Sequence, residues 1–514
     1  MPLCRYFFLL ASLLLCLSIF GQTFQKTYGG AAGMQAFCVR QTGDGGYIIC
    51  GNISIDSVNT DLCLVKTNAA GDTVWMKSYG GPAGEYEGIV EQTSDGGYVM
   101  TGSTYSFGAG AGDIFVVKTD PSGNTLWMYA YGGAGDEIGE YIQQTFDNGF
   151  IVGGHTDTFG PRGDFYLLRL DANGDTIWTR NYGGAKHDHG FCVQQTRDTG
   201  FILVGHSVSF SASGGFGAVK TKSNGDTLWI RGYGGLLDSY CYSVQETSNG
   251  YLLAGTTTSF GAGGSDAMVV KINSAGDTVW TRTYGTAGEE YFNCVKQTPD
   301  GNFILVGSTT RTTDSSDVFL VKIDPNGDTL WTRSYGSARD DEGMYVEVCA
   351  DSGYVIAGLS KSFSGGVSEM YVIKTDRNGN TGCLSRACNI QVSKPDSVQY
   401  YIIANAERPA TQMQQVATAY NAPGGAVTDV CAMFGIPTIS PEDDMFQLFP
   451  SPVTDLLEIR AKKEIGLIRI FDNTGRICYE EKTNVLWAQV RMERFAPGLY
   501  LVEVGGRRLR IVKE

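Results

Sequence analysis

The sequence predicts an all-β fold: a seven-bladed β-propeller of 51-residue repeats whose N-terminal strand closes the last blade, followed by a small C-terminal β-sandwich. Six tryptophans recur at intervals of 52, 51, 51, 51 and 51 residues, at Trp75, Trp127, Trp178, Trp229, Trp280 and Trp331. Seven Tyr-Gly pairs mark the units, with their tyrosines at Tyr28, Tyr79, Tyr131, Tyr182, Tyr233, Tyr284 and Tyr335. A fixed period of this size means that one supersecondary unit is repeated along the chain.

Each unit is expected to form four strands. Four short segments rich in Val, Ile, Tyr, Phe and Trp alternate with Gly, Asn and Asp, and none has an apolar period of 3.6 residues. Asn-Gly pairs such as Asn173-Gly174 and Asn326-Gly327 supply residues that tolerate a positive φ between the third and fourth strands. Four strands per unit, repeated seven times, is the composition of a β-propeller.

The two ends of the array predict how the ring closes. The seventh unit has Gly382-Cys383-Leu384 where a strand with a tryptophan is expected. Residues 24–28 fit the missing strand, with Phe24 in the place of the tryptophan. We therefore expect this segment to complete the last blade, because closure removes open sheet edges that would otherwise aggregate.

The chain divides into four expected regions. Residues 1–21 hold one charge and a short apolar run, the pattern of a secretory signal peptide, and the mature chain has no further transmembrane segment. Residues 22–384 are the propeller, and residues 385–444 are an irregular module and linker in which the period stops. Residues 445–514 form the last domain.

Thirteen cysteines leave eleven after the signal peptide. Cys38, Cys192 and Cys294 occupy equivalent places in separate units, which predicts small buried hydrophobic side chains rather than disulfides. Cys383, Cys388 and Cys431 follow the last blade, and a disulfide among them would staple the ring closure of an exported protein. The pairing is left open.

Residues 445–514 read as short strands and Gly/Asn turns, of the size of a small β-sandwich. The notable residues of this stretch are Phe449, Pro450, Pro452, Asp455, Gly475, Arg476, Gly498, Tyr500 and Lys513. With its Phe-Pro-x-Pro opening, Gly-Arg turn and Pro-Gly-x-Tyr motif, the stretch resembles the C-terminal sorting domain of the bacterial type IX secretion system, although Ser451 stands where the family more often has Asn. The resemblance implies export by the Sec route, recognition of residues 445–514 by the type IX secretion machinery, and release from the cell or anchoring at its outer surface.

Acidic residues cluster in the loops after the Tyr-Gly pairs, which we expect on one face around a central channel. The candidates for a ligand-facing ring are Glu85, Asp136, Glu137, Glu289, Glu290, Asp340 and Asp341. Such a ring would hold Ca²⁺ through carboxylate oxygens or attract a cationic ligand. The alternative is that these carboxylates only solvate a crowded rim.

All four histidines fall within 52 residues, at the junction of the third and fourth units: His155, His187, His189 and His206. Together with Asp188 they form the candidate metal site, because converging imidazoles suit Zn²⁺ or Cu²⁺. The alternative is that they fill a polar rim, since other units carry Asn, Ser or Thr at the places of His155 and His206. No other cofactor is indicated.

The sequence favours a binding function over catalysis. It contains no Gly-x-Ser-x-Gly, His-Glu-x-x-His or phosphate-binding loop, and no candidate catalytic residue stands out. The net charge of −15, without a basic stripe, excludes nucleic acid as a partner. We expect an exported, noncatalytic binding or scaffold protein whose partner is a glycan or surface protein. The alternative is a carbohydrate-active hydrolase or lyase with its site on the acidic, histidine-bearing face.

Overall fold

The computed structural model describes residues 22–29, 33–56, 59–160, 162–211, 213–312, 315–383, 385–388, 390–395, 399–402, 407–408, 413–415, 426–429, 446–449, 456–461, 466–471, 476–485, 487–495, 498–504 and 507–513. The chain divides into two compact units, residues 1–430 and residues 431–514. None of the helices in the described residues is long and apolar enough to cross a membrane. The expected signal peptide lies outside the described residues.

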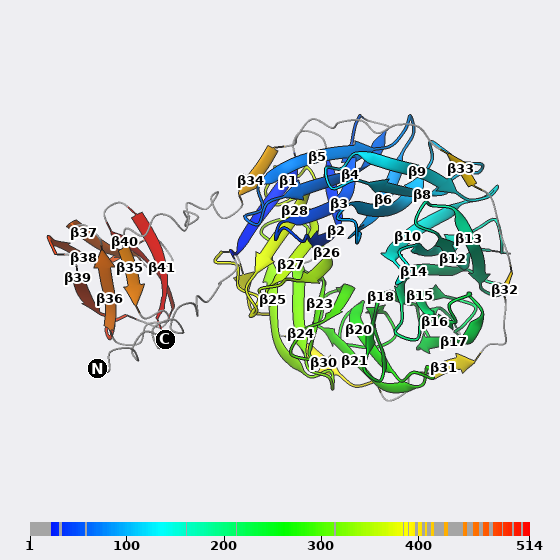
Figure 1. The fold of residues 1–514 in the computed structure, drawn as a ribbon. Helices are drawn as coiled ribbons and strands as arrows, with labels where there is room; N and C mark the ends of the chain where they lie inside the picture. Colours follow the sequence, from blue (N-terminus) through cyan, green and yellow to red (C-terminus); the bar gives the residue numbers. More distant parts are fainter. Residues whose placement is uncertain are drawn as a thin grey trace, which may run out of the picture. The chain divides into compact units, whose positions relative to one another are not determined.

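The first unit is a ring of seven antiparallel sheets (Figure 1), as the repeat predicts. The innermost strands of blades 1 to 7 are β2 (Met34–Gln41), β6 (Glu85–Gln92), β10 (Glu137–Gln144), β14 (Asp188–Gln195), β18 (Ser239–Thr247), β22 (Glu290–Gln297) and β26 (Asp341–Val348). The second strands are β3 (Tyr47–Ser54), β7 (Tyr98–Thr104), β11 (Phe150–Thr156), β15 (Phe201–Ser207), β19 (Gly250–Thr257), β23 (Phe303–Thr312) and β27 (Tyr354–Ser360).

The outer half of each blade consists of a buried third strand and a partly exposed outer strand. The third strands are β4 (Thr60–Thr67), β8 (Asp113–Thr119), β12 (Asp164–Leu170), β16 (Gly215–Thr221), β20 (Asp266–Ile272), β24 (Ser315–Ile323) and β28 (Glu369–Thr375). The outer strands of blades 1 to 6 are β5 (Thr73–Tyr79), β9 (Thr125–Tyr131), β13 (Thr176–Tyr182), β17 (Thr227–Gly234), β21 (Thr278–Gly285) and β25 (Thr329–Tyr335).

The N-terminal strand β1 (Phe24–Gly29) completes blade 7, which confirms the predicted closure. It pairs antiparallel with β28, with Phe24 opposite Lys374 and Tyr28 opposite Met370. Phe24 is 2% exposed, and its ring packs edge-on against Tyr47 of blade 1, 5.9 Å between centroids. The tryptophans of other blades make the same contact with the next blade, as Trp75 does with Tyr98 at 6.0 Å. Phe24 therefore replaces a tryptophan in packing as well as in sequence.

Each Tyr-Gly tyrosine joins its blade to the next one. Tyr28 donates a hydrogen bond to the carbonyl oxygen of Gly71 at 2.6 Å, and Tyr182 donates to Gly225 at 2.6 Å. The remaining tyrosines make equivalent bonds to Gly123, Gly174, Gly276, Gly327 and Gly379. These tyrosines are buried, so each bond satisfies a hydroxyl that would otherwise be costly to remove from water. This recurring contact explains why the tyrosine recurs.

The glycines that accept these bonds are required for two reasons. Gly327 has a φ of +83°, which side-chain-bearing residues rarely adopt. A Cβ atom placed on Gly327 would also lie 3.0 Å from the ring of Trp280 in the preceding blade. The Asn-Gly turn and the tryptophan row are thus parts of one contact between blades.

A second repeated contact, present in six of the seven blades, is an ion pair whose cation is buried and whose aspartate is in five cases more than half exposed. A lysine or arginine of the third strand binds an aspartate in the turn between the first and second strands. The pairs and their N–O distances are Lys66–Asp44 at 2.8 Å, Lys118–Asp95 at 2.8 Å, Arg169–Asp147 at 2.5 Å, Lys220–Asp198 at 3.0 Å, Lys322–Asp300 at 2.6 Å and Lys374–Asp351 at 2.7 Å. Blade 5 departs from this rule, because Asn249 stands where the aspartate is expected.

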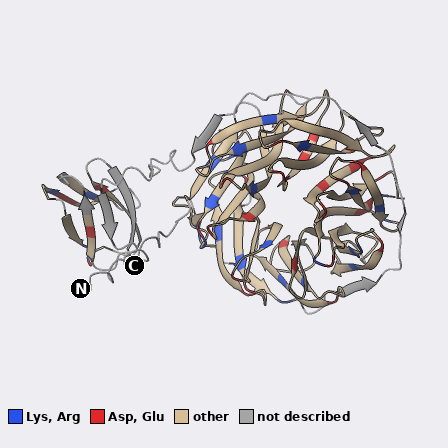
Figure 2. Ribbon diagram, viewed as in Figure 1, with Lys and Arg blue, Asp and Glu red and all other residues tan. Residues whose placement is uncertain are grey.

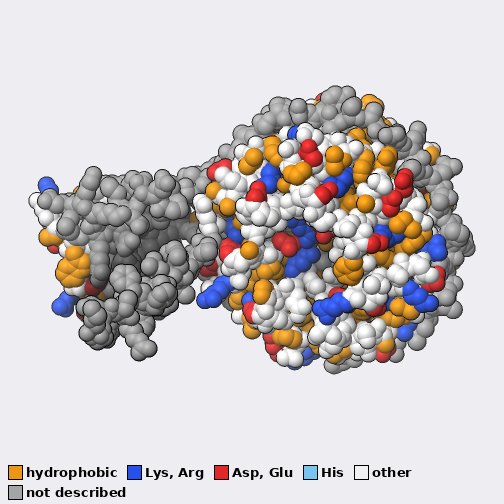
Figure 3. Space-filling view, in the orientation of Figure 1, with side chains coloured by type: hydrophobic (Ala, Val, Ile, Leu, Met, Phe, Trp, Pro, Cys, Tyr) orange, Lys and Arg blue, Asp and Glu red, His pale blue; other side chains and the backbone are white. Residues whose placement is uncertain are grey.

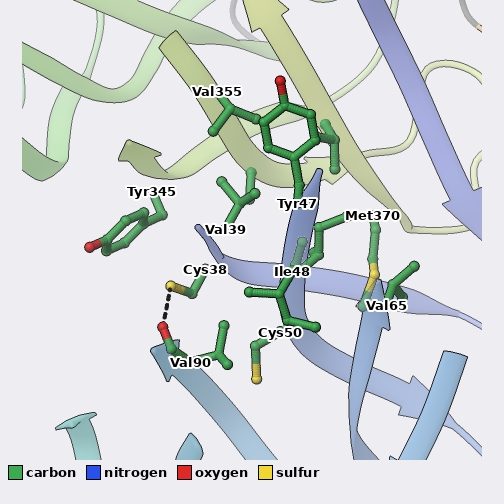
Figure 4. Packing of buried hydrophobic residues seen from close by; sticks show 14 of the residues in the cluster. Cys38, Val39, Tyr47, Ile48, Cys50, Val65, Val90, Tyr345, Val355 and Met370 are labelled. Atoms are coloured by element: carbon green, nitrogen blue, oxygen red, sulfur yellow. Dashed lines mark hydrogen bonds between the residues drawn. The ribbon is translucent and has the colours of Figure 1, made fainter. Parts of the chain in front are cut away.

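The equivalent cysteines are buried free thiols, as predicted. Cys38 is 0% exposed, and its thiol donates to the carbonyl oxygen of Val90 in the next blade at 3.5 Å (Figure 4). Burial raises the pKa of Cys38 to about 11, so the thiol stays protonated. Near the closure, Cys383 is disulfide-bonded and Cys388 is a free, partly buried thiol. Cys431 lies outside the described residues.

The segment after the last blade adds short strands to the outer edges of the blades. Its strands are β29 (Ser385–Arg386), β30 (Gln391–Ser393), β31 (Gln399–Ile402), β32 (Glu407–Arg408), β33 (Met413–Gln415) and β34 (Ala426–Asp429). They pair, in this order, with the outer strands of blades 6, 5, 4, 3, 2 and 7. The chain therefore runs back around the ring, and residues up to Val430 belong to the propeller unit rather than to an irregular module of their own. The linker expected up to residue 444 lies outside the described residues.

The second unit contains two small sheets around one core. They are formed by β35 (Phe446–Phe449), β36 (Leu456–Ala461) and β39 (Trp487–Arg491), and by β37 (Gly466–Phe471), β38 (Ile477–Thr483), β40 (Gly498–Val504) and β41 (Arg507–Lys513). Leu457, Ile468, Val490 and Val502 are among its fully buried side chains. Alternating apolar residues on short strands thus produce the small β-sandwich that the sequence predicts.

Candidate functional site

Four of the predicted ligand-facing acids are fully buried instead. Glu85, Glu137, Glu290 and Asp341 are each 0% exposed, and so is Asp188 of the candidate metal site. Each begins an inner strand and accepts hydrogen bonds from the preceding Tyr-Gly loop and from a hydroxyl of its own blade. Glu85 accepts from the Gly81 amide at 3.0 Å and from Thr104 Oγ1 at 2.7 Å. The prediction that these carboxylates face a ligand is wrong, because their role is to brace the loop from within.

The neighbouring acids do reach the surface. Glu289 is exposed, whereas Asp136 and Asp340 are partly exposed. Asp340 pairs with Lys361 at 3.1 Å. Because adjacent residues of a strand point to opposite sides, only one acid of each neighbouring pair can face solvent. The acidic ring is therefore about half as dense as the sequence indicates.

The histidines gather at the junction of blades 3 and 4, as predicted, and they do so by stacking. The rings of His155 on β11 and His189 on β14 are parallel, 4.2 Å between centroids and 4° between planes. The rings of His187 and His189 meet edge-on at 6.1 Å. His189 and His206 are opposite each other on β14 and β15.

Aromatic residues of blades 4 and 5 extend this stack along the inner strands. His206 lies flat on Tyr240 at 4.2 Å, and Tyr240 stacks on Tyr242 at 6.2 Å. Tyr242 in turn contacts Phe191 at 5.2 Å. We call the set His155, His187, His189, Phe191, His206, Tyr240 and Tyr242 the aromatic cluster. His155 and His206 are buried, whereas the other five rings are partly or fully exposed.

Three histidines of the cluster, His155, His189 and His206, have a lowered pKa, which favours their uncharged form. Burial, assisted by His189, lowers the pKa of His155 to about 3. Burial also lowers the pKa of His189 and His206. Nδ1 of His155 is buried without a hydrogen-bond partner among the described residues, and Nε2 of His206 lies 3.7 Å from the carboxylate of Asp238. The cluster thus presents aromatic rings at the surface, while these two nitrogens are themselves buried.

This geometry does not suit zinc. Tetrahedral zinc needs nitrogen lone pairs that converge on one point about 2.0–2.1 Å away, whereas parallel stacked rings hold their nitrogens in separate planes. Within the part of the chain that the structure describes, no group of three or more His, Cys, Asp or Glu side chains is placed to hold a metal ion. The histidine cluster is therefore corrected from a zinc or copper site to an aromatic surface, and the same finding gives no calcium site on the acidic rim.

A second departure from the repeat, which the sequence reasoning missed, closes the centre of the ring. Arg40 of blade 1 binds Glu347 of blade 7 at 2.7 Å and Tyr141 of blade 3 at 3.1 Å. The hydroxyls of Tyr141 and Tyr345 of blade 7 lie 3.3 Å apart. Arg40 and Lys296 approach the Tyr345 ring, at 4.7 and 4.9 Å from its centroid.

The two contacts of Tyr141, with Arg40 and with Tyr345, join blades that are not neighbours, so these side chains must meet across the axis. Figures 2 and 3 show acidic and basic residues together near the centre of the ring. The sequence did contain a signal for these central contacts. Arg40 and Lys296 stand at the position where three other blades have a glutamine, namely Gln143, Gln194 and Gln245.

A third departure is a carboxyl pair on the inner strands of blades 2 and 3. The side chains of Glu87 and Glu140 are hydrogen-bonded to each other, and burial raises the pKa of both. Glu87 has a φ of +62° at the position where blade 3 has Gly139. A strained, non-glycine residue in this region costs on the order of 1 kcal/mol and often marks a functional site. The pair can share one proton, which is the behaviour of two close carboxyls.

The motif residues of the second unit are placed only in part. Phe449, Gly498 and Lys513 lie on β35, β40 and β41, and Arg476 is exposed just before β38. Tyr500 is 8% exposed and packs edge-on against Phe495 at 5.3 Å. Its role in this unit is therefore to fill the core. Pro450, Pro452, Asp455 and Gly475 lie outside the described residues.

Residues 447–514 match the family model described as the secretion system C-terminal sorting domain. The comparison with curated proteins gave no match. Among solved structures, the chain is similar to a protein of unknown function from Bacteroides caccae, at 12% identity and a TM-score of 0.32, over 51% of this chain and 93% of that one. It is also similar to PorZ, a surface component of the type IX secretion system of Porphyromonas gingivalis, at 10% identity and a TM-score of 0.26, over 94% and 82%.

A third similar structure is an endo-1,5-alpha-L-arabinanase from Thermotoga petrophila, at 12% identity and a TM-score of 0.25, over 69% of this chain and all of that one. Matches this distant do not indicate an activity. The sorting domain, in contrast, implies secretion to the outer surface and interaction with the type IX secretion machinery. The chain is therefore a secreted seven-bladed β-propeller that carries a type IX secretion C-terminal sorting domain.

Proposed function

We propose that the mature protein is a noncatalytic binding protein of the outer cell surface, or released from it, and that it holds a glycan on the aromatic cluster. The observation that carries this proposal is the set of two ring stacks over blades 3, 4 and 5, which Phe191 links through an edge-on contact with His189 and a tilted contact with Tyr242. Sugar rings present apolar C–H faces that pack on aromatic faces, and their hydroxyls bond to polar groups at the ring edges. His189, whose pKa burial lowers, supplies both features without the cost of burying a charge.

The buried acids support a binding role over a catalytic one. Each of them is already occupied by hydrogen bonds within its own blade, as Asp188 is by Ser207 and the Gly184 amide. A general acid or base must instead reach a substrate atom within hydrogen-bond distance. The buried acids that begin the inner strands therefore lack the access that catalysis needs, whereas Asp238, 3.7 Å from His206, is exposed.

A carbohydrate-active hydrolase or lyase is the second candidate, and the pair of Glu87 and Glu140 is the observation that favours it. Two carboxyls that share a proton supply one acid and one base at the same time. They lie on inner strands, as His189, Phe191, Tyr240 and Tyr242 of the aromatic cluster do. In this candidate Glu87 and Glu140 would be the catalytic residues.

The test combines a glycan array with a hydrolysis screen of the mature chain. We expect binding without product release, and a loss of affinity of about tenfold or more in Tyr240→Ala. Phe146→Ala, which removes an exposed ring (67%) from a turn at the opposite end of blade 3, is the control and should bind normally. Glycan turnover that Glu140→Gln abolishes would establish the second candidate, and the absence of any glycan binding would refute both.

A further inference from the structure

In blades 1 to 5, a Gln or Glu at the end of the inner strand ties its blade to the preceding one. The side-chain oxygen of Gln41 accepts from the Ala350 amide at 2.7 Å, and that of Gln92 accepts from the Gly43 amide at 2.9 Å. Equivalent bonds join Gln144 to Ser94, Gln195 to Phe146 and Glu246 to Arg197. All of them lie on the turn face, which we define as the face that carries the turns between first and second strands.

The junction of blades 6 and 7 cannot form this bond. Blade 7 has Val348 in place of the glutamine, so the acceptor is missing. Blade 6 has Pro299 in place of the donor, and proline has no backbone N–H. Both partners are therefore changed together, which leaves neither an unpaired amide nor an unpaired side chain at this junction.

A groove occupies the junction where the bond is missing. Gln297, Pro299, Val348 and Ala350 are among the residues that line a cavity of about 600 Å³. A second cavity of about 540 Å³ shares Thr298, Pro299 and Ser352 with the first and extends outward to Trp331 and Arg377. The two cavities thus form one groove that leads from the inner strands toward the perimeter of the ring.

The two ends of the groove differ in chemistry. At the inner end, Pro299, Val348 and Ala350 contribute apolar side chains beside the polar Gln297 and Thr298. At the outer end, Lys322 is already paired with Asp300, whereas Arg377 is exposed and has no ion pair among the described residues. The other six blades have only Ala, Ser or Pro at the position of Arg377 in the same turn. A cation at this position of the turn is therefore particular to blade 7, although blade 4 has Lys222 one position earlier in its turn.

We propose that this groove binds an extended peptide segment that places an apolar side chain at Val348 and a carboxylate at Arg377. An apolar group and an anion a short distance apart on one linear chain are the chemistry of a peptide rather than of a neutral glycan. Burial of the apolar side chain supplies affinity, and the charge pair at Arg377 sets the direction of the segment. The site is on the turn face and is independent of the aromatic cluster.

The test is binding of the mature chain to an array of random dodecapeptides, in parallel with a glycan array. Wild-type protein should select peptides that share an apolar residue and, a few positions away, Asp or Glu. Val348→Gln fills the inner end with the side chain that most other blades carry there, so it should preserve folding and weaken binding by about tenfold or more. Arg377→Glu should lose the acidic preference, and Lys222→Glu, a charge reversal in the equivalent turn of blade 4, is the matched control.

Each outcome decides the proposal. Selection of such peptides, lost in Val348→Gln and Arg377→Glu and kept in Lys222→Glu and Tyr240→Ala, supports it. It is overturned if no peptide binds above background, if Val348→Gln binds like wild type while its melting temperature is unchanged, or if Val348→Gln abolishes glycan binding instead. If no peptide binds above background, the proposal of a glycan site on the aromatic cluster still stands.

Discussion

The lysine of blade 5 is buried without the counter-charge that the other blades provide. Lys271 is 6% exposed and donates to Thr247 Oγ1 at 2.7 Å and to the Ile272 carbonyl, but Asn249 replaces the aspartate. Burial consequently lowers the pKa of Lys271 from 10.5 to about 8. Asn249→Asp should restore the pair and raise the free energy of unfolding.

The magnitude follows from this pKa. A depression of this size corresponds to a destabilisation of about 3 kcal/mol at neutral pH. That figure is an upper limit for the gain, because five of the six aspartates in the other blades are more than half exposed and water screens their attraction. We therefore expect Asn249→Asp to gain about 1–2 kcal/mol, or about 2–4 °C in melting temperature.

The pH dependence gives a sharper test than the melting temperature alone. Between pH 8 and pH 10.5 the unfolded state binds a proton at Lys271 that the folded state has released. The unfolding free energy contributed by Lys271 therefore rises with pH across this window. In Asn249→Asp the folded pKa returns to its ordinary range, so the rise should disappear.

The assay is denaturant unfolding of wild type and Asn249→Asp at pH 7 and pH 10. Asp95→Asn in blade 2 is the reciprocal control, which should lower stability and introduce a similar rise at Lys118. The reasoning fails if Asn249→Asp is no more stable than wild type at pH 7, or if both proteins gain equally between pH 7 and pH 10.

Two further predictions concern the turns and the histidines. Gly327→Ala should lower the free energy of unfolding by about 1–3 kcal/mol more than Gly301→Ala does. Both glycines have φ near +80°, but only at Gly327 would the added Cβ meet a ring, that of Trp280, at 3.0 Å. Equal melting temperatures of the two variants would contradict this. Between pH 6.5 and pH 5, the free energy of unfolding of the wild type should fall by about 2 kcal/mol more than that of His155→Asn. In this range the unfolded state takes up a proton at His155, whereas the buried side chain in the folded state stays unprotonated down to about pH 3. Parallel acid titrations of the two proteins, followed by circular dichroism, would show whether that difference exists.

The repeat made the ring predictable because its spacing survives in every blade. Phe24 could be placed by sequence alone, since it occupies the tryptophan position of a unit that lacks one. The side to which a residue points was harder to predict. Glu85 precedes a β-bulge and Glu87 lies in it, and only the structure shows that Glu85 turns into the blade while Glu87 pairs with Glu140.

Contacts between distant blades could not be predicted from one unit at a time. Arg40 and Tyr141 are 101 residues apart and meet because their blades face each other across the axis. The short strands from β29 to β34 have two to four residues each, too few to show an alternating pattern. Val348 and Pro299 could be noticed in the sequence, because each differs from the residues at the equivalent position of the other units. Only the structure shows that they are neighbours and that together they remove one hydrogen bond between blades.

The central claim is that β1 closes the ring, and hydrogen–deuterium exchange of the mature chain tests it most directly. The amides of Gln25, Thr27 and Tyr28 should be protected for as long as those of the outer strand β13, because both strands are fully integrated in a blade. Exchange of residues 24–28 within seconds, while β13 stays protected, would show that the N-terminal strand is not part of blade 7 and would contradict the account.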